Sequence, residues 1–142
     1  MSLKPALLFL LSLSSLTLAQ SSPQAPAPAI QSEPLIQTTN SWDGTPYKAY
    51  PSSQPQLAVL RVTIPANTTM KWHTHPVPNA AYVLSGEITV ETKDGAKHHF
   101  TAGQVVPETV NTIHRGVTGA KPAVLIVFYA GTPNLPLSQP AP

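Results

Sequence analysis

The chain of 142 residues contains no cysteine. This absence excludes a disulfide-stabilised scaffold, a zinc site built on thiolates, a cysteine nucleophile and a lipid-anchoring cysteine. Charged residues make up only 10% of the chain and aromatic residues 6%, whereas 17 residues are proline. The hydrophobic content of 42% is nevertheless too high for a disordered protein. These values favour one small all-β domain with turns and extended ends.

Clustered positive charge is also absent. Eight Lys and Arg residues against six Asp and Glu residues give a net charge of +2. Loss of Lys4 with the N-terminal segment described next leaves seven against six, or +1. The other cations are scattered, whereas binding of nucleic acid needs several cations on one surface. The sequence therefore predicts no nucleic-acid partner. A glycine-rich phosphate loop and the G-x-S-x-G motif of serine hydrolases are missing as well.

The N-terminus has the pattern of a secretory signal peptide. Lys4 precedes the largely apolar residues 6–18, and Thr17 and Ala19 are small residues at positions that suit a signal peptidase. We expect cleavage after Ala19, which makes residues 1–19 a removed signal peptide. The mature protein is then secreted or periplasmic, with no stable membrane anchor. An uncleaved N-terminal anchor is the alternative, although the apolar stretch is short for a membrane span.

Proline-rich segments flank the part of the chain that can fold. Residues 20–34 are predicted to be a linker and residues 133–142 a tail, because alternate prolines remove amide donors and favour extended chain. Residues 35–132 are the predicted domain, and they show strand patterns and no convincing helical period. Strands of this length with turns between them indicate a sandwich or barrel. The expected strands cover residues 57–64, 69–75, 80–84, 87–92, 96–100, 105–106 and 123–130.

The tripeptide His73-Thr74-His75 carries the clearest chemical information. On a strand, residues i and i+2 point to the same face, so both imidazoles project together. Two imidazoles placed in this way supply two nitrogen ligands for a first-row transition metal. Two histidines on a solvent-exposed strand face would have the same pattern, and the tripeptide by itself leaves both interpretations open.

Two segments around these histidines resemble the motifs of the cupin superfamily. Residues 67–86 are similar to the first motif, G-x5-H-x-H-x3–4-E-x6-G, and residues 103–118 to the second, G-x5-P-x-G-x2-H-x3-N. The resemblance extends over nearly all of residues 57–131. It implies a double-stranded β-helix, the jelly roll known as the cupin barrel. The matched positions are Asn67, His73, His75, Asn79 and Gly86 in the first segment and Gly103, Thr109, Asn111, His114 and Thr118 in the second.

The departures from these motifs are informative. Asn67 and Asn111 stand where the family usually has glycine, and asparagine is the non-glycine residue that most readily adopts left-handed backbone conformations. Thr109 and Thr118 replace a proline and an asparagine, which we expect to have no direct bearing on metal chemistry. Asn79 replaces the usual metal-binding glutamate. Its amide oxygen can coordinate a hard cation, but it brings no negative charge.

The resemblance implies a divalent transition metal (Fe, Mn, Zn, Ni or Cu) held by His73, His75 and His114, because imidazole suits several such metals. Whether Asn79 contributes a fourth ligand stays open. Glu108, directly before the motif's proline position, is the other candidate, either as fourth ligand or as a catalytic general base. An exposed glutamate at a strand end is the alternative interpretation of Glu108.

These residues suggest several functions. Three neutral imidazoles leave the charge of a divalent metal uncompensated, which favours a small anionic ligand such as a carboxylate or enolate. By resemblance, we expect an exported metal-dependent enzyme acting on a small molecule, with dioxygenase chemistry favoured and isomerase or lyase chemistry open. A non-catalytic module that binds a metal or small ligand outside the cytoplasm is the alternative, and a structural cupin with an empty site is a third. The resemblance also implies a homodimer.

Overall fold

The structure is a computed structural model that describes residues 29–142. The predicted signal peptide and most of the predicted linker lie outside the described residues. The chain divides into two units, Met1–Ser32 and Glu33–Pro142, and the second is the domain described below. Within the described part of the chain, no helix is long and apolar enough to cross a membrane.

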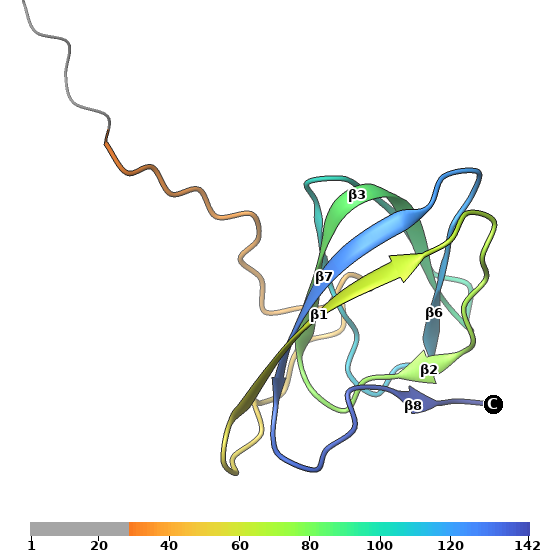
Figure 1. The fold of residues 1–142 in the computed structure, drawn as a ribbon. Coiled ribbons are helices and arrows are strands. Elements are labelled where there is room, and N and C mark those ends of the chain that lie inside the picture. The colour runs from red at the N-terminus through yellow and green to blue at the C-terminus, as the bar shows by residue number, and fades with distance from the viewer. Residues whose placement is uncertain (1–28) are drawn as a thin grey trace, which may run out of the picture. The chain divides into compact units, whose positions relative to one another are not determined.

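The domain is an antiparallel β-structure whose strands curl around a common interior (Figure 1). Residues 29–142 contain no helix, and this confirms the predicted all-β fold. The strands are β1 (Gln56–Ile64), β2 (His73–Thr74), β3 (Asn79–Thr92), β4 (Lys97–Thr101), β5 (Val105–Pro107), β6 (His114–Val117), β7 (Ala123–Gly131) and β8 (Gln139–Pro140).

The central strand of the barrel is β3. The strand order is β1-β7-β3-β6-β2-β8, and β4 and β5 also pair with β3. The first part of β3 pairs with β5 and β7, whereas its second part pairs with β4 and β6. The sequence predicted two strands here, 80–84 and 87–92. They are one strand because the register shift between Val83 and Ser85 and the positive φ of Gly86 bend the chain without ending its pairing.

The core lies inside the curl of the sheet. In the second part of β3 the sequence alternates Glu87, Ile88, Thr89 and Val90, which predicts that Ile88 and Val90 share the inner face, and each is only 3% exposed. In β1 and β7, branched apolar residues make the two strands pair along their whole length, from Gln56 opposite Gly131 to Ile64 opposite Ala123. The buried apolar residues are Ile64, Val77, Ala81, Val83, Ile88, Val90, Phe100, Val106, Ala123, Leu125, Val127 and Tyr129.

Two asparagines form the turns that precede the histidine-bearing strands. Asn67 has a φ of 54° and Asn111 a φ of 60°, so both adopt the left-handed conformation expected at these motif positions. The Asn67 N–H donates to the carbonyl of Gly119 at 2.7 Å, and the Asn111 N–H donates to the carbonyl of His75 at 2.9 Å. The second turn therefore connects the chain before β6 directly to the chain after β2.

The segment predicted as a tail, residues 133–142, lies against the domain. Leu135 and Leu137 pack on the core, and β8 pairs with β2. The two leucines supply the apolar contact that the surrounding prolines do not.

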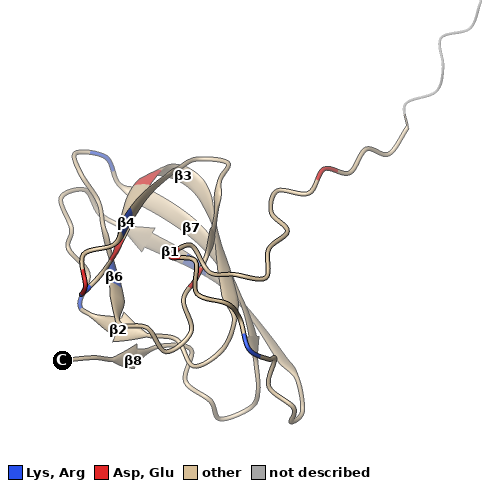
Figure 2. Cartoon of the chain, turned by 180° about the vertical axis from the view of Figure 1, so that it is seen from behind, with Lys and Arg blue, Asp and Glu red and all other residues tan. Residues whose placement is uncertain are grey.

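Positively and negatively charged residues are interspersed along the described part of the chain (Figure 2). Glu91 accepts from Lys97 and from Arg115, each at 2.6 Å. These hydrogen bonds, from Lys97 first and then Arg115, hold the pKa of the Glu91 carboxyl below its usual range. The Arg115 guanidinium also lies over the ring of Trp72, 4.1 Å from its centroid. Arg115 is thus held outside the barrel.

Candidate metal centre

The three predicted histidine ligands meet at one end of β2 and β6. His73 in β2 is directly opposite His114 in β6, and His75 follows two residues later on the same face of the chain. One ring nitrogen from each histidine can be chosen so that all three lie within 4.8 Å of one another. The ring centroids are 4.5 to 5.0 Å apart. The structure therefore brings together residues that are up to 41 positions apart (114 − 73).

Backbone carbonyls orient all three imidazoles. Nδ1 of His73 lies 2.9 Å from the carbonyl oxygen of Lys71, Nδ1 of His75 lies 2.7 Å from that of Leu137, and Nδ1 of His114 lies 2.9 Å from that of Thr112. A carbonyl oxygen can only accept a hydrogen bond, so each Nδ1 must carry the proton. Each Nε2 is then left with a lone pair, which is the arrangement found around metal-binding histidines.

The two buried imidazoles are neutral at physiological pH. Burial lowers the pKa of both His75 and His114 to about 4. Nε2 of His114 is buried and has no hydrogen-bond partner. Buried polar atoms are seldom left without a hydrogen-bond partner. Among the described residues, the Nε2 lone pairs of the three histidines have no such donor, and a cation would satisfy them. The donor set of three neutral nitrogens fits a divalent transition metal.

Glu108 lies beside this cluster and is not the exposed strand-end residue that the sequence left open. Its side-chain Oε2 is 3.4 Å from Nε2 of His114, is buried, and has no hydrogen-bond partner. Burial raises the pKa of the Glu108 carboxyl to about 8. The contact with neutral His114 is therefore not an ion pair. A cation between the two residues would satisfy both unpaired atoms.

The backbone of Glu108 is held on both sides. Its N–H donates to the carbonyl of Asn79 at 3.0 Å, and its carbonyl accepts from the hydroxyl of Tyr47 at 2.7 Å. The preceding carbonyl, of Pro107, accepts from the N–H of Trp42 at 2.8 Å. The loop before β1 thus helps to place the carboxyl group at the histidines.

Asn79, the other candidate fourth ligand, is the first residue of β3. Its side chain is buried, and its Nδ2 donates to the carbonyl of Val77 at 3.2 Å. Its Oδ1 has no partner. Asn79 does not, however, line the cavity between the histidines. Among the described carboxylates and amides, Glu108 is the one placed at that cavity.

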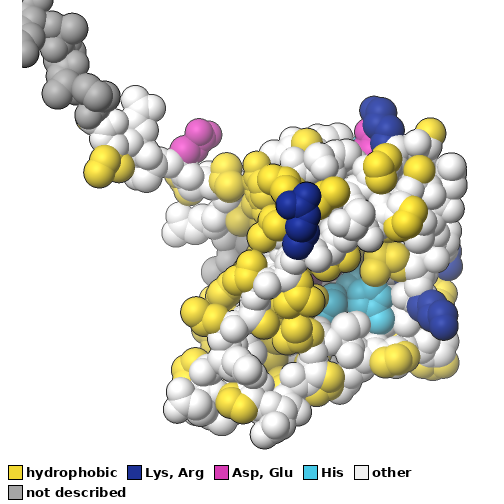
Figure 3. All heavy atoms as spheres, viewed as in Figure 1, with side chains coloured by type: hydrophobic (Ala, Val, Ile, Leu, Met, Phe, Trp, Pro, Cys, Tyr) yellow, Lys and Arg dark blue, Asp and Glu magenta, His cyan; other side chains and the backbone are white. Residues whose placement is uncertain are grey.

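The cavity is small and mostly apolar, with a volume of about 60 Å³. This is enough space for a few water molecules or a small ligand. Histidine side chains are visible in a hollow on the face seen in Figure 3. The lining residues are Val62, Ile64, Met70, His73, His75, Ile88, Val90, Glu108, His114, Gly116, Leu125, Val127 and Tyr129.

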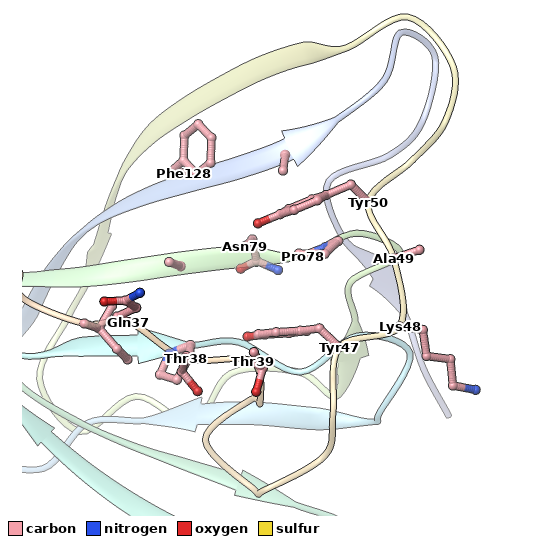
Figure 4. Close-up of a pocket in the computed structure, with 14 residues that line it drawn as sticks. Gln37, Thr38, Thr39, Tyr47, Lys48, Ala49, Tyr50, Pro78, Asn79 and Phe128 are labelled. Carbon is pink, nitrogen blue, oxygen red and sulfur yellow. The ribbon is translucent and has the colours of Figure 1, made fainter.

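A larger groove, of about 530 Å³, is separate from the histidine cavity. Tyr47 and Tyr50 from the loop before β1 border it, together with Phe128 from β7 (Figure 4). None of its lining residues is a histidine or a carboxylate. The groove therefore has no ligand set for a metal.

Two residues of the centre were not identified from the sequence. Tyr129 is buried, and its ring centroid is 5.6 Å from that of His75. Alternation along 123–130 places Tyr129 and Val127 on one face, but it does not say which face is inside. Thr109, which was expected to have no direct bearing on metal chemistry, contacts one of the proposed ligands. Its Oγ1 lies 2.9 Å from Nδ1 of His114, because the turn at Asn111 folds the chain back.

The remaining histidines, His98 and His99, are exposed on β4 and do not join the cluster. Nδ1 of His99 instead contacts Oγ1 of Thr89 at 3.1 Å.

Comparisons with known proteins agree with this geometry. A family model described as "Cupin domain" matches residues 60–129. A search of the curated proteins found no match. The solved structures that resemble the chain show its fold alone, because their sequences are at most 22% identical in the cases given next.

Three of these solved structures illustrate the likeness. The DMSP lyase DddQ from Ruegeria pomeroyi DSS-3 is 22% identical with a TM-score of 0.52, over 66% of this chain and 45% of the lyase. An uncharacterized protein with a double-stranded β-helix domain from Klebsiella pneumoniae is 19% identical with a TM-score of 0.52, over 68% and 91%. The oxalate decarboxylase of Lactobacillus farciminis is 19% identical with a TM-score of 0.50, over 59% and 26%. The chain thus matches less than half of the lyase and of the decarboxylase.

Proposed function

Residues 60–129 are a cupin domain, and from this premise we propose that the protein is a metal-dependent enzyme that acts on a small anionic molecule outside the cytoplasm. His73, His75 and His114 hold the divalent transition metal. The observation that carries the proposal is the convergence of three imidazoles whose Nδ1 protons all go to backbone carbonyls. Export rests on the N-terminal sequence pattern alone.

A divalent metal in this position supplies Lewis acidity toward substrate oxygen atoms and, if it is redox-active, reactivity toward dioxygen. The residues of the chain determine what can bind. Neutral imidazoles add no negative charge, so an anionic substrate gains the most from the site. Apolar walls such as Val62 and Val127 exclude water and strengthen that attraction by lowering the local dielectric constant.

Glu108 is the residue assigned to proton transfer. Its carboxyl group lies at the cavity and its backbone is fixed on both sides. With a pKa of about 8 in the metal-free protein, the group holds its proton at neutral pH and can donate it to a bound substrate. A bound cation would lower this pKa, and the carboxylate could then take a proton from the substrate. Two of the solved structures are named as a lyase and a decarboxylase. Lyase chemistry therefore stands beside dioxygenase chemistry in this proposal.

The preference for an anion can be tested on the Co²⁺-loaded protein. Acetate and acetamide have nearly the same shape and differ in charge. We expect acetate to change the visible spectrum of Co²⁺ at lower concentration than acetamide does, because it offsets the uncompensated metal charge. Equal or tighter binding of acetamide would contradict an anionic substrate.

The role of Glu108 is tested by Glu108→Gln, which keeps the size of the side chain and removes its ability to act as a base. We expect full metal content and turnover slowed by about 100-fold or more. The assay follows substrate loss and oxygen uptake for small carboxylates and enols, on protein loaded with each of the five metals. Glu87→Gln is the matched control, because Glu87 is on the same barrel but pairs with exposed Lys121 at 3.4 Å.

Each outcome separates the candidate functions. If Glu108→Gln also loses metal, Glu108 is a ligand and not a base. If every metal-loaded form binds acetate but turns over none of the test compounds, the protein is a binding module, which is the alternative that replacement of the usual glutamate by Asn79 favours.

A further inference from the structure

The last ten residues of the chain, 133–142, contact β2, which carries the proposed ligand His73, and the proposed ligand His75 that follows it. They include four prolines and no charged residue, and they follow the part of the chain that matches the family model. β8 pairs with β2, with Pro140 opposite His73 and Gln139 opposite Thr74. The N–H of Ala141 extends this pairing by donating to the carbonyl of Trp72 at 3.0 Å.

Strand β2 depends on this pairing because it has few other partners. It is only two residues long, and it pairs with β6 at a single position, His73 opposite His114. On its other side it pairs with β8 at two positions. In Figure 1, β8 lies at the outer side of β2 and ends the sheet. Without β8, β2 would become an edge strand that pairs with β6 at one position, with the hydrogen bonds of Met70 and His75 to the β6 region on either side of it.

The same segment orients His75 directly. His73 and His114 donate to carbonyls only two residues away in sequence, at Lys71 and Thr112. His75 donates to Leu137, which is 62 residues away, and this contact of 2.7 Å is the shortest of the three. The orientations of two imidazoles are thus set locally, whereas that of the third is set by the C-terminal segment.

We propose that the metal centre needs the C-terminal segment 133–142 for tight metal binding. Within this segment, Leu137 is the positioning residue of His75. The inference rests on the proposed metal site. The Leu137 carbonyl accepts the Nδ1 proton, which directs the Nε2 lone pair of His75 toward His73 and His114. Leu135 and Leu137 anchor the segment by packing on the core. When the segment is lost, His75 can rotate and adopt the other tautomer, and the site keeps two oriented nitrogen donors.

The experiment replaces residues 133–142 by an uncharged Gly-Ser segment of equal length, so that neither chain length nor charge changes. We expect Co²⁺ to bind about 10 to 100-fold more weakly, measured by competition with a chelator. In the metal-free protein, ¹⁵N shifts of the imidazoles should show His75 leaving the Nδ1–H tautomer while His73 and His114 keep it. Ser138→Ala is the matched control, because Ser138 is exposed in the same segment and its replacement leaves both anchoring leucines and the Leu137 carbonyl in place.

A second pair of variants covers the case in which the replaced protein does not fold. Ala141→Pro removes the N–H that donates to Trp72, whereas Ala141→Ser keeps it. We expect weaker Co²⁺ binding and a changed His75 tautomer only for Ala141→Pro. Folded variants that bind Co²⁺ as tightly as the unchanged protein overturn the inference. If the unchanged protein binds no Co²⁺, the proposed metal site fails, and the His75 tautomer still decides whether Leu137 positions the ring.

Discussion

His114→Ala is expected to reduce the metal content of the purified protein from stoichiometric to background. His114 is the most central ligand, with 1% of its surface exposed and its ring 4.5 Å from that of His73 and 5.0 Å from that of His75. Removing a residue that only supports a ligand lowers metal affinity by about 10 to 100-fold. Removing the ligand itself should cost more than about 100-fold. Elemental analysis and Zn²⁺ competition with a chelator measure both quantities.

His73→Ala should also reduce the metal content to background. His99→Ala is the control variant, and it should keep the metal content and Zn²⁺ affinity of the unchanged protein. His99 is exposed on β4, and its Nδ1 lies 3.1 Å from Oγ1 of Thr89, away from the cluster. Zn²⁺ should also raise the melting temperature of the unchanged protein and of His99→Ala, because a ligand that binds only the folded state stabilises it. If the unchanged protein and both ligand variants contain equally little metal, the proposal of a histidine metal site fails.

Gly86→Ala is expected to destabilise the fold more than other alanine substitutions of glycine in this chain. Gly86 has a φ of +77°, where a side chain costs about 1–2 kcal/mol. The added methyl group would also overlap the carbonyl oxygen of Pro122 and lie 3.2 Å from Cα of Ala123. Both contacts are with backbone of the neighbouring strand region, and overpacking adds about 1–3 kcal/mol. We expect a total loss of about 3 kcal/mol or more in the free energy of unfolding, measured by urea denaturation.

Two other glycines separate the causes of this loss. Gly95 has a φ of +96° with open space around it, so Gly95→Ala should cost about 1 kcal/mol from conformation alone. Gly119 has neither a positive φ nor a close neighbour, so Gly119→Ala should stay within about 0.5 kcal/mol of the unchanged protein. If Gly86→Ala lowers the free energy of unfolding no more than Gly95→Ala does, the close approach of β3 to the chain before β7 does not affect stability.

Local pattern was enough to predict most of the barrel. The predicted strands 57–64 and 123–130 agree with β1 and β7 to within one residue at each end, because continuous runs of branched apolar side chains suit buried strands. The alternation at Ile88 and Val90 was also sufficient to predict their inward side. The strand β6 was not predicted, since His114–Val117 is short, contains Gly116 and has no apolar run. β8 was not predicted because it contains a proline and pairs with a distant segment.

The sequence by itself placed His73 and His75 on one face, because residues i and i+2 of a strand point the same way. The resemblance to the cupin motifs added His114 and marked Asn67 and Asn111 as turn positions, where both adopt positive φ. Only the tertiary structure decided that Glu108 is buried at His114, that Tyr129 faces His75, and that Leu137 holds His75. These contacts join segments far apart in the chain. They arise because the barrel closes, and no local pattern of residues predicts which distant segments then come into contact.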